Sequence, residues 1–169
     1  MVGQSVCRYV RDVLTSNMDI APINHSLVVL IKFPMPEYLH QFRPVGLCNV
    51  IFKVITKVIV GRLKKLMSKL ISEVQSSFVP GRYIRDNIIV AQEIIHSMRK
   101  MKGNRGFMAI KVDLEKAYDC LNWSFIRDTL TVARLHSELV KVIMHCIKSS
   151  FLSILWNGCA TLKFNPTEV

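Results

Sequence analysis

The sequence predicts an α+β fold in which helices and short strands are mixed along one domain. Between residues 49 and 73, apolar residues recur at the spacing of a helix face. The apolar runs at 26–32 and 107–113 have the length of buried strands. Two further apolar runs flank Asn157 and Gly158, a residue pair that favours a type I′ hairpin turn.

The first half of the chain is predicted to contain two helices and a strand. Residues 4–14 are weakly helical, and residues 26–32 form a strand. Pro34, Pro36 and Pro44 then favour an extended or turning segment, because proline fixes φ and restricts the residue before it. The long helix from about 49 to 73 places these apolar residues on one side: Ile51, Ile55, Val58, Leu63, Leu66 and Leu70.

The second half alternates helices with strands. A loop at 75–85 precedes a helix capped by Asp86, whose predicted inward face is Ile88, Ala91, Ile95 and Met98. A break at 103–106 leads into the strand at 107–113. Asn122 or Ser124 caps a helix to about 132, and Ser137 begins another to about 147. Residues 151–156 and 159–164 form the hairpin.

Length and composition indicate a packed globular chain. Its 169 residues suffice for one domain with a core, and 50% of them are hydrophobic. No apolar run reaches the roughly 18 residues that span a bilayer, so no membrane partner is expected. The five cysteines are odd in number, widely spaced and without a zinc-binding pattern. They indicate reduced, mostly buried thiols without disulfide partners in an intracellular protein, nuclear or cytoplasmic.

Positive charge is concentrated in two parts of the chain, which has a net charge of +11. The first group lies between Glu37 and Glu73, a stretch that contains no acidic residue. The second group lies between Arg82 and Lys111. The first group is Arg43, Lys53, Lys57, Arg62, Lys64, Lys65 and Lys69. Such asymmetry favours a polyanionic partner, although each lysine taken singly is also explained as a solvated residue on a helix surface.

Asp113 is the first candidate for chemistry, because the predicted strand 107–113 delivers its carboxylate to a strand end. Hard oxygen ligands of this kind hold Mg²⁺ in nucleotidyl transfer, which uses two ions that one aspartate cannot hold. Two plainer interpretations remain open: Asp113 forms a turn, and Asp119 caps the following helix. Tyr118 is equally explained as a core aromatic residue.

Residues 113–119, which read DLEKAYD, resemble the first catalytic motif of reverse transcriptases from non-LTR (LINE-type) retrotransposons, especially plant elements. Three further blocks resemble the same family in its order and spacing: QFRPVGLCNV at 41–50, QSSFVPGR at 75–82 and ILWNG at 154–158. The resemblance extends from about residue 24 to 164. It departs after the first strand, where the family's proline is displaced to Pro34.

The resemblance implies a fingers and partial palm fragment of a right-hand polymerase, with an incomplete palm sheet. Residues 1–23 would be an N-terminal helical extension, and residues 24–169 a partial reverse transcriptase domain. The family's second aspartate motif is expected after Phe164, yet the chain ends at Val169 without it. The resemblance therefore implies an N-terminal fragment that is inactive alone. The alternatives are a non-catalytic nucleic-acid-binding remnant and an unstable pseudogene product.

The resemblance also implies residue roles, a cofactor and partners. Asp113 would be the catalytic, metal-binding aspartate, with Mg²⁺ as cofactor and Mn²⁺ as the alternative. The partners would be an RNA template, a DNA primer and deoxynucleoside triphosphates. The other implied roles are triphosphate binding by Arg43 and Lys53, a steric gate by Tyr118, template or nucleotide contact by Arg82 with Gly81, and support by Asp119.

Overall fold

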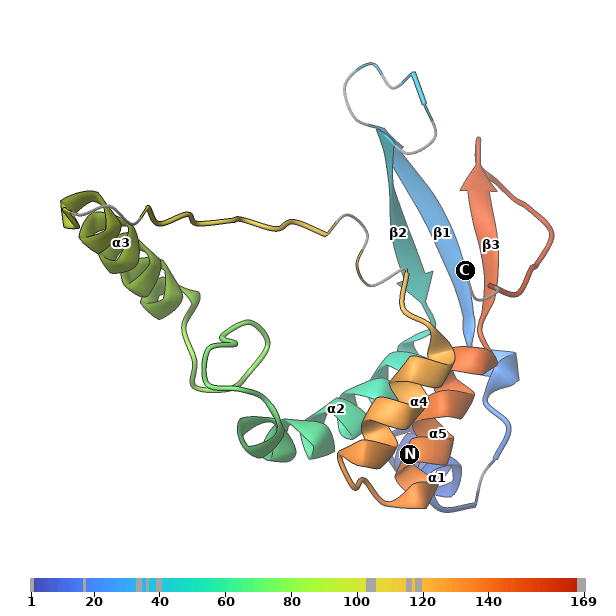
Figure 1. Ribbon diagram of the computed structural model, residues 1–169. Coiled ribbons are helices and arrows are strands. Elements are labelled where there is room, and N and C mark those ends of the chain that lie inside the picture. Colours follow the sequence, from blue (N-terminus) through green and yellow to red (C-terminus); the bar gives the residue numbers. More distant parts are fainter. Residues whose placement is uncertain are drawn as a thin grey trace. The chain divides into compact units, whose positions relative to one another are not determined.

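The computed structural model of the chain describes residues 2–16, 18–32, 35, 37–38, 41–102, 106–114, 117 and 120–166 (Figure 1). The chain divides into two compact units, a first unit of residues 1–59 and 118–169 and a second unit of residues 60–117. In chain order, the elements are α1 (Val2–Ser16), the 3₁₀ turn η1 (Ala21–Ile23), β1 (His25–Lys32), β2 (Phe42–Cys48), α2 (Val50–Leu70), α3 (Ile84–Lys100), α4 (Trp123–Val132), α5 (Ser137–Lys148), β3 (Phe151–Trp156) and β4 (Cys159–Ala160). This mixed α/β architecture confirms the predicted class.

The first unit contains a four-stranded sheet in the order β2-β1-β3-β4. β1 pairs antiparallel with β2 and parallel with β3, so that Val29 lies opposite Val45 on one side and Leu155 on the other. The strand β2 was not predicted, because its Pro44 cannot donate a hydrogen bond to a ladder. A proline is tolerated in an edge strand, and β2 lies at the edge of the sheet with Pro44 opposite Leu30.

The β3–β4 hairpin has the predicted turn. Asn157 has a φ of 48° and Gly158 a φ of 82°, and a type I′ turn requires positive φ at both central residues. The second strand is shorter than predicted. Only Cys159–Ala160 forms β4, and beyond it a single bridge joins Leu152 to Phe164.

The helices α1, α4 and α5 gather at one end of this sheet (Figure 1). Asn122 caps α4, as predicted, by accepting a hydrogen bond from the Ser124 N–H at 2.8 Å. The helix α5 begins at Ser137, as predicted, and His136 Nδ1 accepts from the Glu138 N–H just before it. Apolar residues of α1 and α5 and Ile20, which directly precedes η1, contribute to the core of the unit: Val10, Val13, Ile20, Val140, Val142 and Met144.

Asn24 ties three elements of the first unit together. Its side chain is buried, and its Nδ2 donates to the Cys146 carbonyl at 2.7 Å and to Ser149 Oγ at 3.0 Å. Its own carbonyl accepts a hydrogen bond of 2.9 Å from the Phe151 N–H. The start of β1 is thereby fixed to the end of α5 and to the start of β3.

Replacing Asn24 with alanine is expected to lower the free energy of unfolding by about 1–3 kcal/mol, because two half-buried acceptors lose the donor of a buried side chain. Urea denaturation followed by circular dichroism measures this loss. Thr15→Ala is the control, since the Thr15 hydroxyl also donates to a carbonyl but is exposed. Equal losses in the two variants would contradict a special role for Asn24.

The helix α2 agrees with the predicted long helix. Asn49 Oδ1 accepts from the Ile51 N–H at 2.8 Å and so caps its start. Ile55, which belongs to the predicted apolar pattern, is buried together with Ile59. Leu66 of the same apolar pattern is 38% exposed, and the later part of the helix belongs to the second unit.

The second unit corrects the prediction for α3. The helix begins at Ile84, and Asp86 lies inside its first turn and does not cap it. The residues that were predicted to face a core are exposed in part, with 53% for Ile88 and 45% for Ile95. No residue of α3 is buried, because none of the elements that the structure describes in this unit covers its apolar face.

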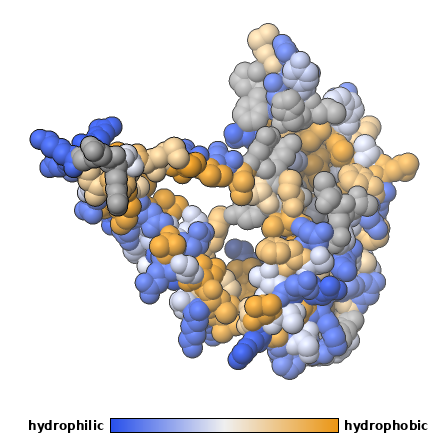
Figure 2. All heavy atoms as spheres, viewed as in Figure 1, coloured by the Kyte–Doolittle hydropathy of each residue, from blue (hydrophilic) through white to orange (hydrophobic). Residues whose placement is uncertain are grey.

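Residues 107–113 do not form the predicted strand. The segment from 106 to 114 has no regular secondary structure, and its apolar side chains face solvent (Figure 2). Met108 is 80% exposed, and Ile110 and Val112 are each 73% exposed. A strand gains its backbone hydrogen bonds from a neighbour, and no described segment pairs with this one.

The cysteines are free thiols, but the prediction that most are buried was wrong. Cys7, Cys120 and Cys159 are exposed, and Cys48 and Cys146 are half-buried. Burial raises the pKa of the Cys146 thiol to about 11, so it is protonated at neutral pH and a poor nucleophile. In the described part of the chain, no helix combines the length and apolarity needed to cross a bilayer.

Candidate nucleic-acid interface

The helix α2 carries a basic stripe, which we define as Lys53, Lys57 and Lys64. At about 100° per residue, these three side chains lie within about 40° of one another around the helix axis. The buried residues Ile55 and Ile59 lie on the opposite side. All three lysines are exposed. The stripe is therefore held toward solvent by the burial of the other face.

The rest of α2 adds positive charge without any acidic residue. Arg62, Lys65 and Lys69 are exposed and lie on a second side of the helix. Among the residues that the structure describes, none of the six basic side chains of α2 forms an ion pair. Uncompensated charge of this kind attracts a polyanion such as a phosphate backbone.

Arg43 and Lys53, the two residues predicted to bind the triphosphate, both belong to the first unit and are ten positions apart in the sequence. Arg43 lies in the edge strand β2, where it pairs with Ile31 of β1, and it is exposed. Lys53 lies in the first turn of α2, where its N–H donates to the Asn49 carbonyl. The edge strand β2 ends at Cys48, and α2 begins directly after its cap, Asn49.

Gly81 and Arg82 lie in the loop between α2 and α3, in the second unit. Gly81 has a φ of 78°, a conformation that glycine adopts without strain. Arg82 donates to three backbone carbonyls, those of Ile71, Ser72 and Gln75. Its guanidinium therefore fastens the loop to residues 71–75, the segment that directly follows α2.

Asp113 is exposed in the irregular segment 106–114 of the second unit, so its carboxylate is accessible to solvent. Tyr118 and Asp119 lie outside the described residues. Among the described residues, no group of three histidine, cysteine, aspartate or glutamate side chains is placed to hold a metal ion. An exposed carboxylate is a suitable hard ligand for Mg²⁺, but these residues alone do not assemble a metal centre.

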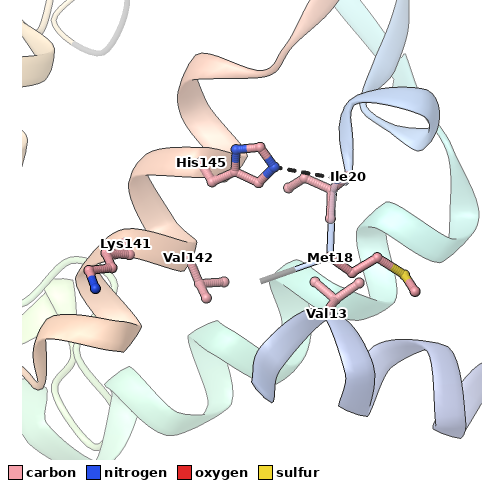
Figure 3. A pocket seen from close by; sticks show the side chains of 6 residues that line it. All are labelled: Val13, Met18, Ile20, Lys141, Val142 and His145. Atoms are coloured by element: carbon pink, nitrogen blue, oxygen red, sulfur yellow. Dashed lines mark hydrogen bonds between the residues drawn. The ribbon is translucent and has the colours of Figure 1, made fainter. Parts of the chain in front are cut away.

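A cavity of about 220 Å³ lies between α1 and α5 in the first unit (Figure 3). Val13, Ile20 and Val142 line it, and His145 Nε2 accepts a hydrogen bond from the Ile20 N–H at 3.4 Å. Asp19 Oδ1 lies 3.3 Å from the same nitrogen. The cavity is smaller than the roughly 300–1,000 Å³ of typical ligand pockets.

Phe78 in the α2–α3 loop and Asn87 at the start of α3 were missed as candidates from the sequence. Asn87 Nδ2 donates to the Val74 carbonyl at 2.8 Å and to Ser76 Oγ at 3.1 Å. Phe78 is 85% exposed with a φ of 64°. The Pro80-Gly81 pair does signal a turn, but no pattern in the sequence indicates a left-handed phenylalanine.

The net charge of +11 and a helix without acidic residues are typical of the class of proteins that bind polyanions. Comparison with known families narrows this class. Residues 32–166 match the family model described as reverse transcriptase (RNA-dependent DNA polymerase). The match covers most of the chain, and the chain therefore belongs to the reverse transcriptase family. Enzymes of this family use divalent metal ions, nucleotides and a nucleic-acid template and primer.

One relative is a transposon protein. The chain is 29% identical over 148 residues to the "Transposon TX1 uncharacterized 149 kDa protein" of Xenopus laevis. The alignment covers 85% of this chain and 11% of the relative, so the chain spans a small part of that protein's length.

Proposed function

We propose that this chain is the fingers and first palm part of an RNA-directed DNA polymerase from a LINE-type retroelement, of plant origin. The observation that carries the proposal is the family match over residues 32–166, which includes the DLEKAYD motif. The similarity to a transposon protein supports the element class. Residues 24–169 would be the partial polymerase domain, and residues 1–23 a helical extension.

The proposed site residues divide into metal-binding and nucleotide-binding groups. Asp113 would hold Mg²⁺ or Mn²⁺, which when bound neutralises phosphate charge. Its exposure in the structure supports access to an ion. Tyr118 would limit the sugar to deoxyribose, and Asp119 would support the motif.

Arg43 and Lys53 would bind the triphosphate, for which a planar guanidinium and a compact ammonium are suited. Gly81 and Arg82 would keep the α2–α3 loop in place beside the nucleotide or template. The three carbonyl contacts of Arg82 support a positioning role for this side chain.

The second candidate function is nucleic-acid binding without chemistry. The basic stripe on α2 favours it, because phosphate binding needs only exposed positive charge. We propose that the 169-residue chain binds a primer–template but does not extend it alone, since Asp113 is one carboxylate where two ions are used.

Asp113→Asn is expected to weaken Mn²⁺ binding to the chain without changing its affinity for an RNA–DNA primer–template. Electron paramagnetic resonance measures free Mn²⁺, fluorescence anisotropy measures nucleic-acid binding, and a primer-extension assay accompanies both. Asp128→Asn is the control, because Asp128 is an exposed aspartate on α4 outside the motif.

Three results would count against parts of this proposal. Unchanged Mn²⁺ binding in Asp113→Asn would remove its metal role. Primer extension that this variant abolishes would show that the chain is active alone. Failure of the unsubstituted chain to bind the primer–template at low salt would contradict both candidate functions.

A further inference from the structure

We propose that Phe78 is a stacking platform for an unpaired base of single-stranded nucleic acid. The inference rests on the proposed function, because it assumes that the second unit binds a nucleic acid. It adds a contact with the base to the contacts with phosphates that basic residues of the second unit would make.

The loop between α2 and α3 is held from within by side chains. Arg82 donates to the carbonyls of Ile71, Ser72 and Gln75, and Asn87 donates to Val74 and Ser76. The acceptors are backbone carbonyls that follow the last turn of α2, together with the Ser76 hydroxyl. The conformation of the loop is therefore fixed by its own hydrogen bonds.

The loop also has an inside and an outside. Ser76 is 8% exposed and Val79 is 5% exposed, so both face inward. Phe78 lies between them in sequence and is 85% exposed. A large aromatic ring thus projects from a fixed loop into solvent, which is the arrangement that stacking on a base requires.

The backbone of Phe78 is strained in order to place the ring there. Its φ of 64° is left-handed, a conformation that is unfavourable for a bulky residue with a Cβ. Gly81, three residues later, adopts a similar φ without this cost. The strained conformation of Phe78 does not bury its ring, so it has no evident stabilising role. Strained backbone conformations of this kind are concentrated at binding and active sites.

The electrostatic surroundings favour an anionic strand. Residues 60–87 contain six basic residues and two acids, Glu73 and Asp86. The basic residues are Arg62, Lys64, Lys65, Lys69, Arg82 and Arg85. Arg82 is engaged with carbonyls, so the side chains on α2 and Arg85 are the ones available for phosphates. Aromatic rings beside a basic surface are the common composition of single-strand binding sites.

The test compares two RNA strands about 12 nucleotides long, one with bases and one abasic throughout. Fluorescence anisotropy with the full chain measures both affinities. Phe78→Ala is expected to weaken binding of the strand with bases by about 5- to 150-fold, because stacking on one base is lost. Binding of the abasic strand and the salt dependence of binding should not change.

Two matched variants sharpen the test. Tyr83→Ala removes another exposed aromatic ring from the same loop, one with an ordinary φ of −117°, and should change the affinity less than twofold. Phe78→Gly relieves the backbone strain, so it should fold at least as stably as the unsubstituted chain and still lose the preference for bases. Phe78→Trp should restore binding, with tryptophan fluorescence quenched by the strand with bases only.

Several outcomes would overturn the inference. Equal binding of the two strands by the unsubstituted chain would overturn the stacking contact and leave the proposed function intact. A Phe78→Ala variant that changes the oligomeric state, but not the preference for bases, would make Phe78 a protein contact. Absence of binding to either strand at low salt would overturn the inference and the proposed function together.

Discussion

Replacing Lys53, Lys57 and Lys64 together with glutamate is expected to weaken binding of an RNA–DNA duplex by about 10²- to 10³-fold. The basic stripe faces solvent and has no ion-pair partner among the described residues, so its charge is available for phosphates. Each lost phosphate contact lowers the slope of log K against log salt by about 0.9. Three contacts correspond to a fall of about 2.7 in that slope.

Anisotropy titrations at several salt concentrations measure both quantities. The control is the variant with Arg8, Arg11 and Lys163 replaced by glutamate, which has the same change in net charge at exposed positions outside α2. Circular dichroism should show that both variants are folded. An equal loss of affinity in the control would mean that overall charge, and not the stripe, determines binding.

Ile55→Asp is expected to unfold the first unit. The Ile55 side chain has no solvent exposure, and an ionised carboxylate without a partner costs several kcal/mol to bury. The free energy of unfolding of a domain is about 5–15 kcal/mol in total, so this substitution removes a large part of it. Thermal denaturation followed by circular dichroism measures the result.

Val54→Asp is the matched control, since Val54 precedes Ile55 in α2 and is 38% exposed. Its melting temperature should fall by much less, because the new carboxylate remains in contact with water. If both variants melted at the same temperature, the charge at this end of α2 and not its burial would be responsible.

The sequence predicted the features that neighbouring residues determine. The Asn157-Gly158 turn, the Asn122 cap and the extent of α2 all depend on residues within a few positions of one another. These signals act through local hydrogen bonds and backbone preference, so they can be read without knowledge of the tertiary structure.

The errors concern features that depend on distant partners. Residues 107–113 have the composition of a strand, but a strand also needs a neighbour, and composition does not supply one. The edge strand β2 was missed for the opposite reason, because Pro44 argues against a strand unless its position at the edge is known.

The sequence indicates which residues are candidates for the site, but it does not indicate how they are arranged in space. Arg43, Lys53 and Asp113 are all exposed, which is compatible with binding from solvent. The role of Arg82 in fastening a loop was not predictable, because its acceptors are backbone carbonyls that carry no side-chain signal. Phe78 was missed because its conformation, and not its residue type, distinguishes it.

The tie made by Asn24 has a consequence for how the chain folds during its synthesis. Asn24 emerges from the ribosome early, yet the Cys146 carbonyl that its amide contacts lies 122 residues later. The parallel pairing of β1 with β3 waits for the same late segment. Contacts of such high sequence separation slow folding, and the β3-facing edge of β1 would stay unpaired during this interval. Until β3 is made, that edge has unpaired backbone groups that another chain could pair with.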